Sequence, residues 1–452
     1  MTASNVLWQW QPQPSVADRL AEGRELRARV PRRSLAELTI GERDPIGLLN
    51  RQNEARVQAL VPLRTERMSA SAFTFYRGSA ALMADDLARG ATTGIGVASC
   101  GDAHVSNFGF YASQSRQLVF DLNDFDEAGW APWEWDLKRL VASIVIAGQA
   151  TGRDDRVVQQ TARDAVLTYA QVIDTGARLS PLRRYYARFN IDDARGNMSK
   201  HSREVLRQAI RTAMKRTGDR AVARVTELDP EGRLRFIEDA PTMTHVSQKF
   251  VEGVPVLVQR YLESASADIR MVMRNYVVSD VVRRVVGVGS VGTRCFLTVF
   301  QDGHDGALLL QSKEAGRSVL EQYGGILQPP VLTNLVEAQG EGARVVAMQR
   351  ILQAESDPFL GCFRSDDGLS HYQRQWHDMK GGIEMDTLDD GPFKTYAEAC
   401  AAVLARAQSA NAPVVAGYLG RGRAAAEALT EWSYAYADLS RSDYRTFLAA
   451  HT

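Results

Sequence analysis

The chain has 452 residues, of which 45% are hydrophobic and 24% charged. This composition is that of an ordinary globular protein and excludes a disordered or low-complexity chain. The 54 Lys and Arg residues balance the 54 Asp and Glu residues, so the formal net charge of zero gives no sign of a nucleic-acid or membrane-surface partner. The length allows roughly two to four domains or lobes.

The expected compartment follows from features that the sequence lacks. No uninterrupted apolar run approaches the ~20 residues that a membrane-spanning helix needs, and residues 1–13 lack the basic and apolar regions of a secretory signal. The four cysteines are far apart and form no CxxC pair, which favours a reducing compartment over a disulfide framework or a zinc knuckle. We therefore expect a cytoplasmic protein.

The first half of the chain is predicted to be mainly helical. Residues 15–60 are typical of short helices interrupted by proline, and one short apolar strand is expected at 118–120. Longer helices are expected at residues 71–88, 134–150, 154–174 and 199–215. The last of them carries a basic stripe, Lys200, Arg203, Arg207, Arg211 and Lys215. Such a stripe usually marks a solvated face and less often an anion-binding surface.

The pattern changes in the second half. Apolar or β-branched runs separated by glycine-containing turns predict a small antiparallel sheet with strands at 277–286, 295–300, 308–311, 359–363 and 371–376. One helix is expected within this region at 332–353, and two Ala-rich helices are expected at 396–409 and 423–450.

The densest motif is Cys-Gly-Asp-Ala-His-Val-Ser-Asn at residues 100–107, followed beyond a strand by Asp-Leu-Asn-Asp-Phe-Asp-Glu-Ala at 121–128. A loop, a short hairpin and a second loop would gather Asp102, Asn107 and Asp124 around one point. Carboxylate and amide oxygens suit Mg²⁺, and Asp102 is placed to accept a proton from a hydroxyl nucleophile. The predicted metal ligands are Asn107, Asp124 and Asp121, and the predicted catalytic residues are Asp102 and His104. The alternative is that these residues cap turns and helices.

The second motif is Gly-Val-Gly-Ser-Val-Gly at residues 287–292. It does not open a helix, so a dinucleotide-binding site is excluded. Instead it joins two predicted strands, and Lys313 lies near the end of the third, an arrangement typical of the phosphate grip of protein kinases. The predicted nucleotide-binding residues here are Gly287, Gly289, Ser290, Gly292 and Lys313. A plain tight hairpin and an ordinary edge-strand lysine are the alternatives.

Other chemistries have no comparable signal. The sequence contains no HExxH, no Gly-x-Ser-x-Gly elbow and no GxxxxGK[ST] phosphate loop. The group Trp130, Trp133 and Trp135 is interpreted as packing rather than as a base-stacking platform, because no basic groove accompanies it.

The motif at 100–107 resembles the catalytic loop of aminoglycoside phosphotransferases and choline kinases, His-Gly-Asp-x-His-x-x-Asn, with Cys100 in place of the first His. The resemblance implies that Asp102 is the catalytic Asp and that Asn107 and Asp124 bind metal. It also implies that Asp136, in Trp-Asp-Leu at 135–137, steadies the loop. The second His of the pattern, at His104, favours a small hydroxylated acceptor.

Nearly the whole chain also resembles a bacterial family of unknown function, DUF2252. The resemblance rests on the segments 75–78, 100–104, 120–127, 132–139 and 287–294. It supplies no substrate.

The order of the motifs is unusual, because the glycine motif and Lys313 follow the catalytic loop instead of preceding it. We therefore predict an α+β, bilobal, protein-kinase-like fold that is circularly permuted, a rearrangement that is tolerated when the old termini lie close together. The expected regions are an N-terminal helical arm at 1–93, a helical catalytic lobe at 94–265, a small antiparallel-sheet nucleotide lobe at 266–385 and C-terminal helices at 386–452.

Further details follow from this arrangement. The helix at 396–409 would pack beside the catalytic loop, and residues 371–381 would form the hinge that contacts adenine. The acidic partner of Lys313 would be Glu337 or Glu341, with Glu321 as a third candidate.

The expected function is an ATP- and Mg²⁺-dependent phosphotransferase that acts on a hydroxyl acceptor, most simply a small molecule. Two alternatives remain open: nucleotidyl transfer or ATP-driven activation of a carboxylate or amine on the same fold, and a nucleotide-binding pseudokinase without catalysis.

Overall fold

The computed structural model describes residues 12–189, 198–304, 306–376 and 379–451. Most of the N-terminal segment inspected for a signal, and His377 and Asp378 of the predicted hinge, lie outside these ranges. Within them, no helix combines the length and the apolar character that crossing a bilayer requires.

The helix predicted at 71–88 is two helices that meet at Ser79, but the N-terminal region otherwise consists of short helices, as predicted for residues 15–60. They are α1 (Val16–Arg29), α2 (Pro45–Glu54), α3 (Val61–Ser69), α4 (Ala72–Gly78) and α5 (Ala80–Arg89). Local sequence fixes where they start: Ser15 and Asp18 form a capping box at α1, and the Asp44 side chain caps α2 ahead of Pro45.

Two small antiparallel pairs of strands follow. The strands are β1 (Gly96–Ser99), β2 (Phe108–Ala112), β3 (Leu118–Leu122) and β4 (Gly129–Pro132), with β1 paired to β4 and β2 paired to β3. This topology places residues 100–107 after β1 and most of the motif at 121–128 after β3, and the backbone N–H of Asn123 bonds to the Asn107 carbonyl between the two loops.

Helices make up most of the next section. They are α6 (Trp133–Ala150), α7 (Asp155–Ala177), α8 (Pro181–Tyr185), α10 (Lys200–Met214), α11 (Gly218–Val225), α12 (Gln248–Ser264) and α13 (Ala267–Met273). The short pair β5 (Thr226–Leu228) and β6 (Leu234–Phe236) follows α11. Helix α6 is buried along almost its whole length, and Trp133 and Trp135 on it are 0% and 3% exposed. These two tryptophans are therefore packing residues, as interpreted from the sequence.

The predicted antiparallel sheet is present and has six strands in the order β11-β12-β10-β9-β8-β7. They are β7 (Met243–His245), β8 (Val277–Arg284), β9 (Cys295–Gln301), β10 (Ala307–Glu314), β11 (Gly361–Arg364) and β12 (Ser370–Gln375). Alternate side chains of β10 enter different cores: Leu309 packs with α11 residues on one face, and Leu308 and Leu310 pack with α12 and α13 residues on the other. The sheet is therefore covered on both faces.

The predicted helix at 332–353 is wrong in one respect, because it is two helices. They are α15 (Pro330–Gln339) and α16 (Glu341–Leu352), and the short α14 (Val319–Gln322) precedes them. Gly340 separates them with a φ of +89°, a left-handed conformation that ends a helix and favours glycine. Because of this break, α16 is a separate helix, and it packs against β11 and β12.

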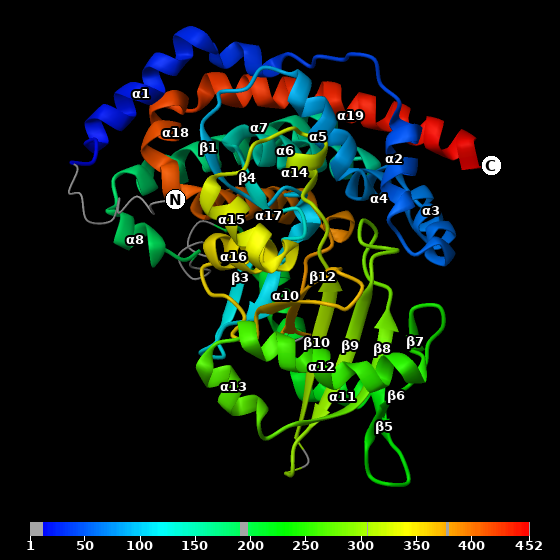
Figure 1. The fold of residues 1–452 in the computed structure, drawn as a ribbon. Coiled ribbons are helices and arrows are strands. Elements are labelled where there is room, and N and C mark those ends of the chain that lie inside the picture. Colours follow the sequence, from blue (N-terminus) through cyan, green and yellow to red (C-terminus); the bar gives the residue numbers. More distant parts are fainter. Residues whose placement is uncertain (1–11, 190–197, 305, 377–378, 452) are drawn as a thin grey trace.

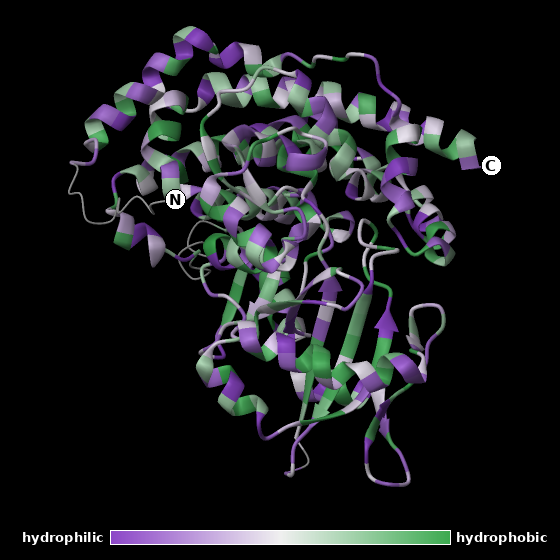
Figure 2. Ribbon diagram, in the orientation of Figure 1, coloured by the Kyte–Doolittle hydropathy of each residue, from purple (hydrophilic) through white to green (hydrophobic). Residues whose placement is uncertain are grey.

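The chain ends in the helices α17 (Asp390–Ala407), α18 (Ala412–Leu419) and α19 (Arg423–His451). They pack with α6 and α7 in the largest hydrophobic core, so both ends of the chain contribute to one helical region. Figure 1 shows this helical region at the top and the six-stranded sheet below it. Figure 2 shows apolar residues concentrated on the strands of the sheet, whereas the outer helix α1 is largely hydrophilic. The fold is thus a mixed α+β fold.

Candidate active site

Asp136 on α6 anchors the loop of residues 100–107, which lies between β1 and β2. The Asp136 carboxylate accepts hydrogen bonds from the backbone N–H groups of Cys100 (2.8 Å) and Gly101 (3.0 Å). It also accepts one from the Gln408 amide (3.1 Å), just beyond α17. This is the steadying role that the resemblance implied for Asp136.

Asp102, in the same loop, forms an ion pair that the sequence did not reveal. Arg139 on α6 approaches Asp102 Oδ1 with its Nη2 at 2.8 Å and also donates to the Tyr76 carbonyl. Burial raises the pKa of Asp102 above its usual range, and Arg139 offsets only part of that rise. The other oxygen, Oδ2, lies 3.6 Å from His104 Nε2. Burial, with the nearby charges of Arg77 and Arg139, holds the pKa of His104 well below its usual range, so His104 is neutral.

Asn107 and Asp124, two of the predicted metal ligands, line one cavity together. The Asn107 amide nitrogen donates to the Asp102 carbonyl (2.5 Å), so the amide oxygen is the atom available to a cation. The Asp124 side chain remains 35% exposed. Burial raises its pKa, but Lys313, Arg374 and Lys380 outweigh that effect and hold the pKa well below its usual range. Asp124 is therefore ionised and accessible.

This donor set fits Mg²⁺. One amide oxygen and one carboxylate are hard ligands, and Mg²⁺ commonly takes one or two protein carboxylates and completes its shell with water and phosphate. In the described ranges, no three His, Cys, Asp or Glu side chains gather as a metal cage. A site of this kind would therefore depend on its ligand for part of the coordination.

Lys313 reaches this cluster from β10 of the six-stranded sheet. It is 1% exposed, forms an ion pair with Asp126, and lies with its Nζ 3.8 Å from Asp124 Oδ2. Tyr372 on β12 donates to the other oxygen of Asp126 (2.7 Å). Although burial lowers the pKa of Lys313, the two carboxylates more than reverse this and raise it above the usual range. Lys313 is therefore a permanent cation beside Asp124.

The prediction that Glu337, Glu341 or Glu321 is the acidic partner of Lys313 is wrong. Glu341 pairs with Arg344 (2.6 Å) and Glu321 pairs with Arg317 (2.5 Å), whereas Glu337 accepts a bond from Arg364 through its backbone oxygen. Arg344 on α16 donates to the carbonyls of Asp126, Ala128 and Gly316. Because of the break at Gly340, α16 presents this arginine to the loop after β3, and Lys313 finds its partners in that loop.

The prediction of Asp121 as a metal ligand is also wrong. Asp121 lies within β3, is 1% exposed, and pairs with Arg406 of α17 (2.6 Å). Its second oxygen accepts the backbone N–H of Ala354 (2.9 Å). Strand geometry fixes this side chain in the interface with α17, away from the loops that carry Asn107 and Asp124.

The glycine loop, defined here as residues 287–293 between β8 and β9, is held by the N-terminal arm. Arg67 donates to the Gly287 carbonyl (2.7 Å), and Val57 donates from its backbone to the Gly292 carbonyl (2.8 Å). Arg56 donates to the Val291 carbonyl (2.5 Å). The loop is therefore an ordered turn, and Gly287 and Gly292 supply positive φ angles of +66° and +91°.

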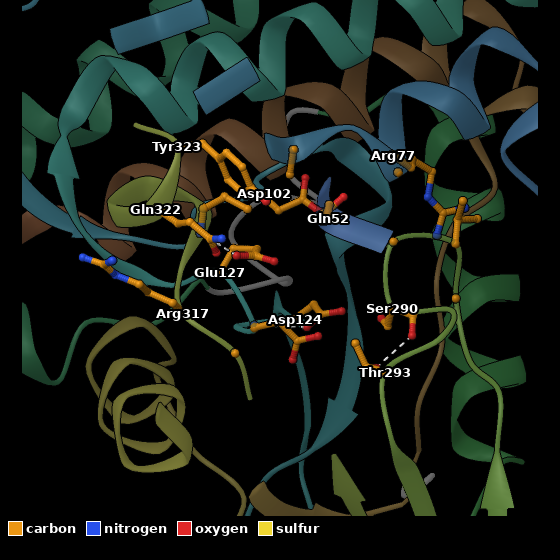
Figure 3. A pocket seen from close by; sticks show the side chains of 18 of the residues that line it. Gln52, Arg77, Asp102, Asp124, Glu127, Ser290, Thr293, Arg317, Gln322 and Tyr323 are labelled. Atoms are coloured by element: carbon orange, nitrogen blue, oxygen red, sulfur yellow. Dashed lines mark hydrogen bonds between the residues drawn. The ribbon is translucent and has the colours of Figure 1, made fainter. Parts of the chain in front are cut away.

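The glycine loop and the Asp-rich loops face each other across one cavity of about 280 Å³, here called the first cavity. Figure 3 shows Asp102, Asp124 and Glu127 on one side and Ser290 and Thr293 on the other. The predicted residues that line it are Asp102, His104, Asn107, Asp124, Gly287, Gly289 and Ser290. Arg77 also lines it, whereas the basic stripe of α10 does not. Two motifs that are remote in sequence thus share one cavity.

A second cavity, of about 270 Å³, lies on the hinge side of the same residues. Asn107 and Asp124 line both cavities. The second cavity also contains three cationic side chains, those of Arg216, Arg374 and Lys380. Burial, followed by the charge of Arg374, lowers the pKa of Lys380 to about 7. The sequence placed Arg374 and Lys380 only within the predicted hinge at 371–381, because a lone basic residue on or after a strand carries no signal of its own.

The fold and this site define an α+β protein with acidic, glycine-rich and basic groups around two cavities that share Asn107 and Asp124 in their linings. The chain belongs to the family described as "Uncharacterized protein conserved in bacteria (DUF2252)", whose model matches residues 56–450. No curated protein and no solved structure matches the chain.

Proposed function

We propose that this protein is an ATP- and Mg²⁺-dependent phosphotransferase that acts on a small hydroxylated acceptor. One observation carries the proposal: Lys313 from the sheet lies 3.8 Å from Asp124, and Asp124 lines one cavity together with the glycine loop and Asp102. A phosphate grip, a pair of metal ligands and a proton acceptor are the parts that phosphoryl transfer uses.

The proposed fold is a circularly permuted kinase-like fold, with the region boundaries at 93/94, 265/266 and 385/386. Three features support it. The glycine loop joins β8 to β9 and Lys313 lies on the next strand, which is the order of these parts in protein kinases. After the sheet, α17 packs against the catalytic loop, because Tyr396 donates to the carbonyls of Val105 (2.8 Å) and Phe108 (3.1 Å). Read from β8 through α17 and then from β1 onward, the parts follow the kinase order.

In the proposed reaction, the acceptor oxygen forms a bond to the γ-phosphorus while the bond from that phosphorus to the β–γ bridging oxygen breaks. The acceptor proton passes to Asp102, whose raised pKa favours this role. Arg139 fixes the orientation of the Asp102 carboxylate, and Lys313 adds positive charge beside the phosphates. Mg²⁺, held by Asn107 and Asp124, would supply further charge neutralisation. ADP is the expected product.

The test combines binding with product analysis. We expect ATP with Mg²⁺ to raise the thermal unfolding midpoint, since a ligand of the native state stabilises it by about 2.7 kcal/mol at 100 times its Kd. Turnover over a panel of hydroxylated acceptors should release ADP. Asp102→Asn should lower the rate by about 10²- to 10⁴-fold and leave nucleotide binding intact.

Different outcomes separate the alternatives. Release of AMP would replace phosphoryl transfer by nucleotidyl transfer or ATP-driven activation. Nucleotide binding with full activity in Asp102→Asn would remove the catalytic assignment. Absence of any nucleotide binding, with or without Mg²⁺, would contradict the proposal as a whole.

A further inference from the structure

The second cavity holds more positive charge than its carboxylates balance. Arg216, Arg374 and Lys380 line it with one carboxylate, that of Asp124, so with all three bases protonated the charge of the lining is 3 − 1 = +2. Arg374 is anchored by bonds to the Asn123 carbonyl (3.2 Å) and the Gln311 side chain (3.1 Å). Arg374 is therefore fixed in place beside Asp124.

Lys380 differs from the other two cations in its partners. The structure gives its ammonium group no hydrogen bond and no ion pair with any residue of the described ranges. Only its backbone is used: the Lys380 carbonyl accepts a bond from Arg216 (3.4 Å), and the next residue, Gly381, bonds to Phe110. The backbone is thus held, while the ammonium group is attracted only by carboxylates, those of Asp124 and Asp126, that also act on Lys313 and Arg374.

A half-buried cation without a direct ion pair costs stability unless a ligand compensates it. Asp124 does not serve this purpose fully, because it already lies beside Lys313 and is one of the two proposed metal ligands. A divalent cation between Asn107 and Asp124 would increase the positive excess further. The cluster therefore favours a ligand with several negative charges.

We propose that Lys380 and Arg374 bind the phosphate chain of a nucleoside di- or triphosphate that enters through the second cavity. This inference rests on the proposed function and adds the direction from which the nucleotide approaches. The chain would cross Asn107 and Asp124, which line both cavities, and bring its terminal phosphate to the glycine loop and Asp102 in the first cavity. The acceptor would then share the first cavity with the terminal phosphate.

The experiment compares nucleotide affinity in the full-length protein and its variants by titration calorimetry. The probes are ADP and adenosine, measured without divalent cations so that the metal ligands do not contribute. Lys380→Gln should raise the Kd for ADP at least 10-fold and change that for adenosine less than twofold. Lys380→Arg should restore most of the ADP affinity. Lys249→Gln, at an exposed lysine on α12, is the matched control and should change neither.

Folding is checked separately. Because Lys380→Gln removes an unpaired cation, the ligand-free variant should unfold at the same temperature as the wild type or higher. A loss of ADP affinity with an unchanged or raised midpoint supports a binding role rather than a structural one.

The outcomes distinguish this inference from the proposed function. Equal ADP affinity in Lys380→Gln and the wild type would overturn the inference and leave the proposed function standing. If the wild type binds no adenine nucleotide, the proposed function fails, and inorganic tripolyphosphate becomes the probe. If the wild type binds tripolyphosphate and Lys380→Gln weakens this binding, the anion site stands. If tripolyphosphate does not bind in this way, the anion site is overturned.

Discussion

Two buried lysines show how the surroundings of a residue decide its charge. Lys313 is 1% exposed and Lys138 is 2% exposed, so burial lowers the pKa of both. Two carboxylates adjoin Lys313 and raise its pKa overall. Lys138 on α6 has only the more distant charge of Glu134 and the ring of Trp432, 4.5 Å from its Nζ. Its pKa is therefore lowered to about 8.

Lys138→Met should stabilise the protein at neutral pH. The unfolded chain holds this proton up to a pKa of about 10.4, whereas the native state loses it near pH 8. The unfolded state thus binds more protons than the native state between these pH values. The free energy of unfolding of the wild type therefore rises with pH in this range. At pH 7 the variant should be more stable by about 1–3 kcal/mol, after the lost ring contact is allowed for. The gap should close by about pH 10.5.

Urea unfolding of both proteins at pH 7, 8, 9 and 10 measures this difference. The same replacement at exposed Lys249 is the control and should leave stability nearly unchanged at each pH. A constant gap between Lys138→Met and the wild type would show that the effect is hydrophobic packing and not titration.

At this same scale, the sequence predicted the acidic residues of the site better than their partners. Asp102, Asn107 and Asp124 are neighbours because short strands carry their loops, and a local motif contains that information. Arg139, the partner of Asp102, comes from a helix, and Lys380, which lines the second cavity with Asp124, comes from a segment after β12. No local pattern encodes such pairings, because they depend on which elements pack together.

At the scale of elements, the arm and the glycine loop form one unit. Val57 and Leu60 of the arm share a small apolar cluster with Val285 and Val291, and backbone bonds reinforce it. The sequence predicted the strands on either side of the glycine loop and the arm's short helices, but it gave no sign that they touch. It also missed the break at Gly340, since one glycine within an apolar helical pattern is usually tolerated.

Gly292→Ala should weaken this unit. Its φ of +91° disfavours any side chain, and an added Cβ would lie 3.0 Å from the Cβ of Arg56. We expect a loss of about 1–3 kcal/mol in the free energy of unfolding. Gly253→Ala, inside α12 with open space around it, should instead stabilise by about 0.5–1 kcal/mol.

Chemical denaturation of both variants provides the comparison. Equal effects at the two positions would mean that the glycine loop does not need its left-handed turn. A destabilised Gly292→Ala that also becomes sensitive to proteolysis within the arm would show that loop and arm are coupled.

At the scale of the whole molecule, the site exists because distant segments converge. The sheet supplies Lys313 and the glycine loop, and the loops after β1 and β3 supply Asp102 and Asp124. The arm and α17 contact these loops from outside. The sequence predicted this convergence only through the order of its motifs. The composition of each segment determines whether it forms a helix or a strand. The packing of the sheet against the loops after β1 and β3 depends instead on contacts such as those of Arg344, and the spacing of residues in the sequence does not reveal such contacts.

Nucleotide binding should therefore protect several remote segments together. With ADP and Mg²⁺, we expect slower amide hydrogen exchange in residues 100–107, in the glycine loop and in residues 379–382. Each lines one of the two cavities in whole or in part, and a ligand that bridges them suppresses local opening. The β5–β6 pair, on the far part of the sheet region, is the internal control and should exchange unchanged. Protection confined to the glycine loop alone would mean that the two cavities do not act as one site, and uniform protection would reflect global stabilisation instead of a bound chain of phosphates.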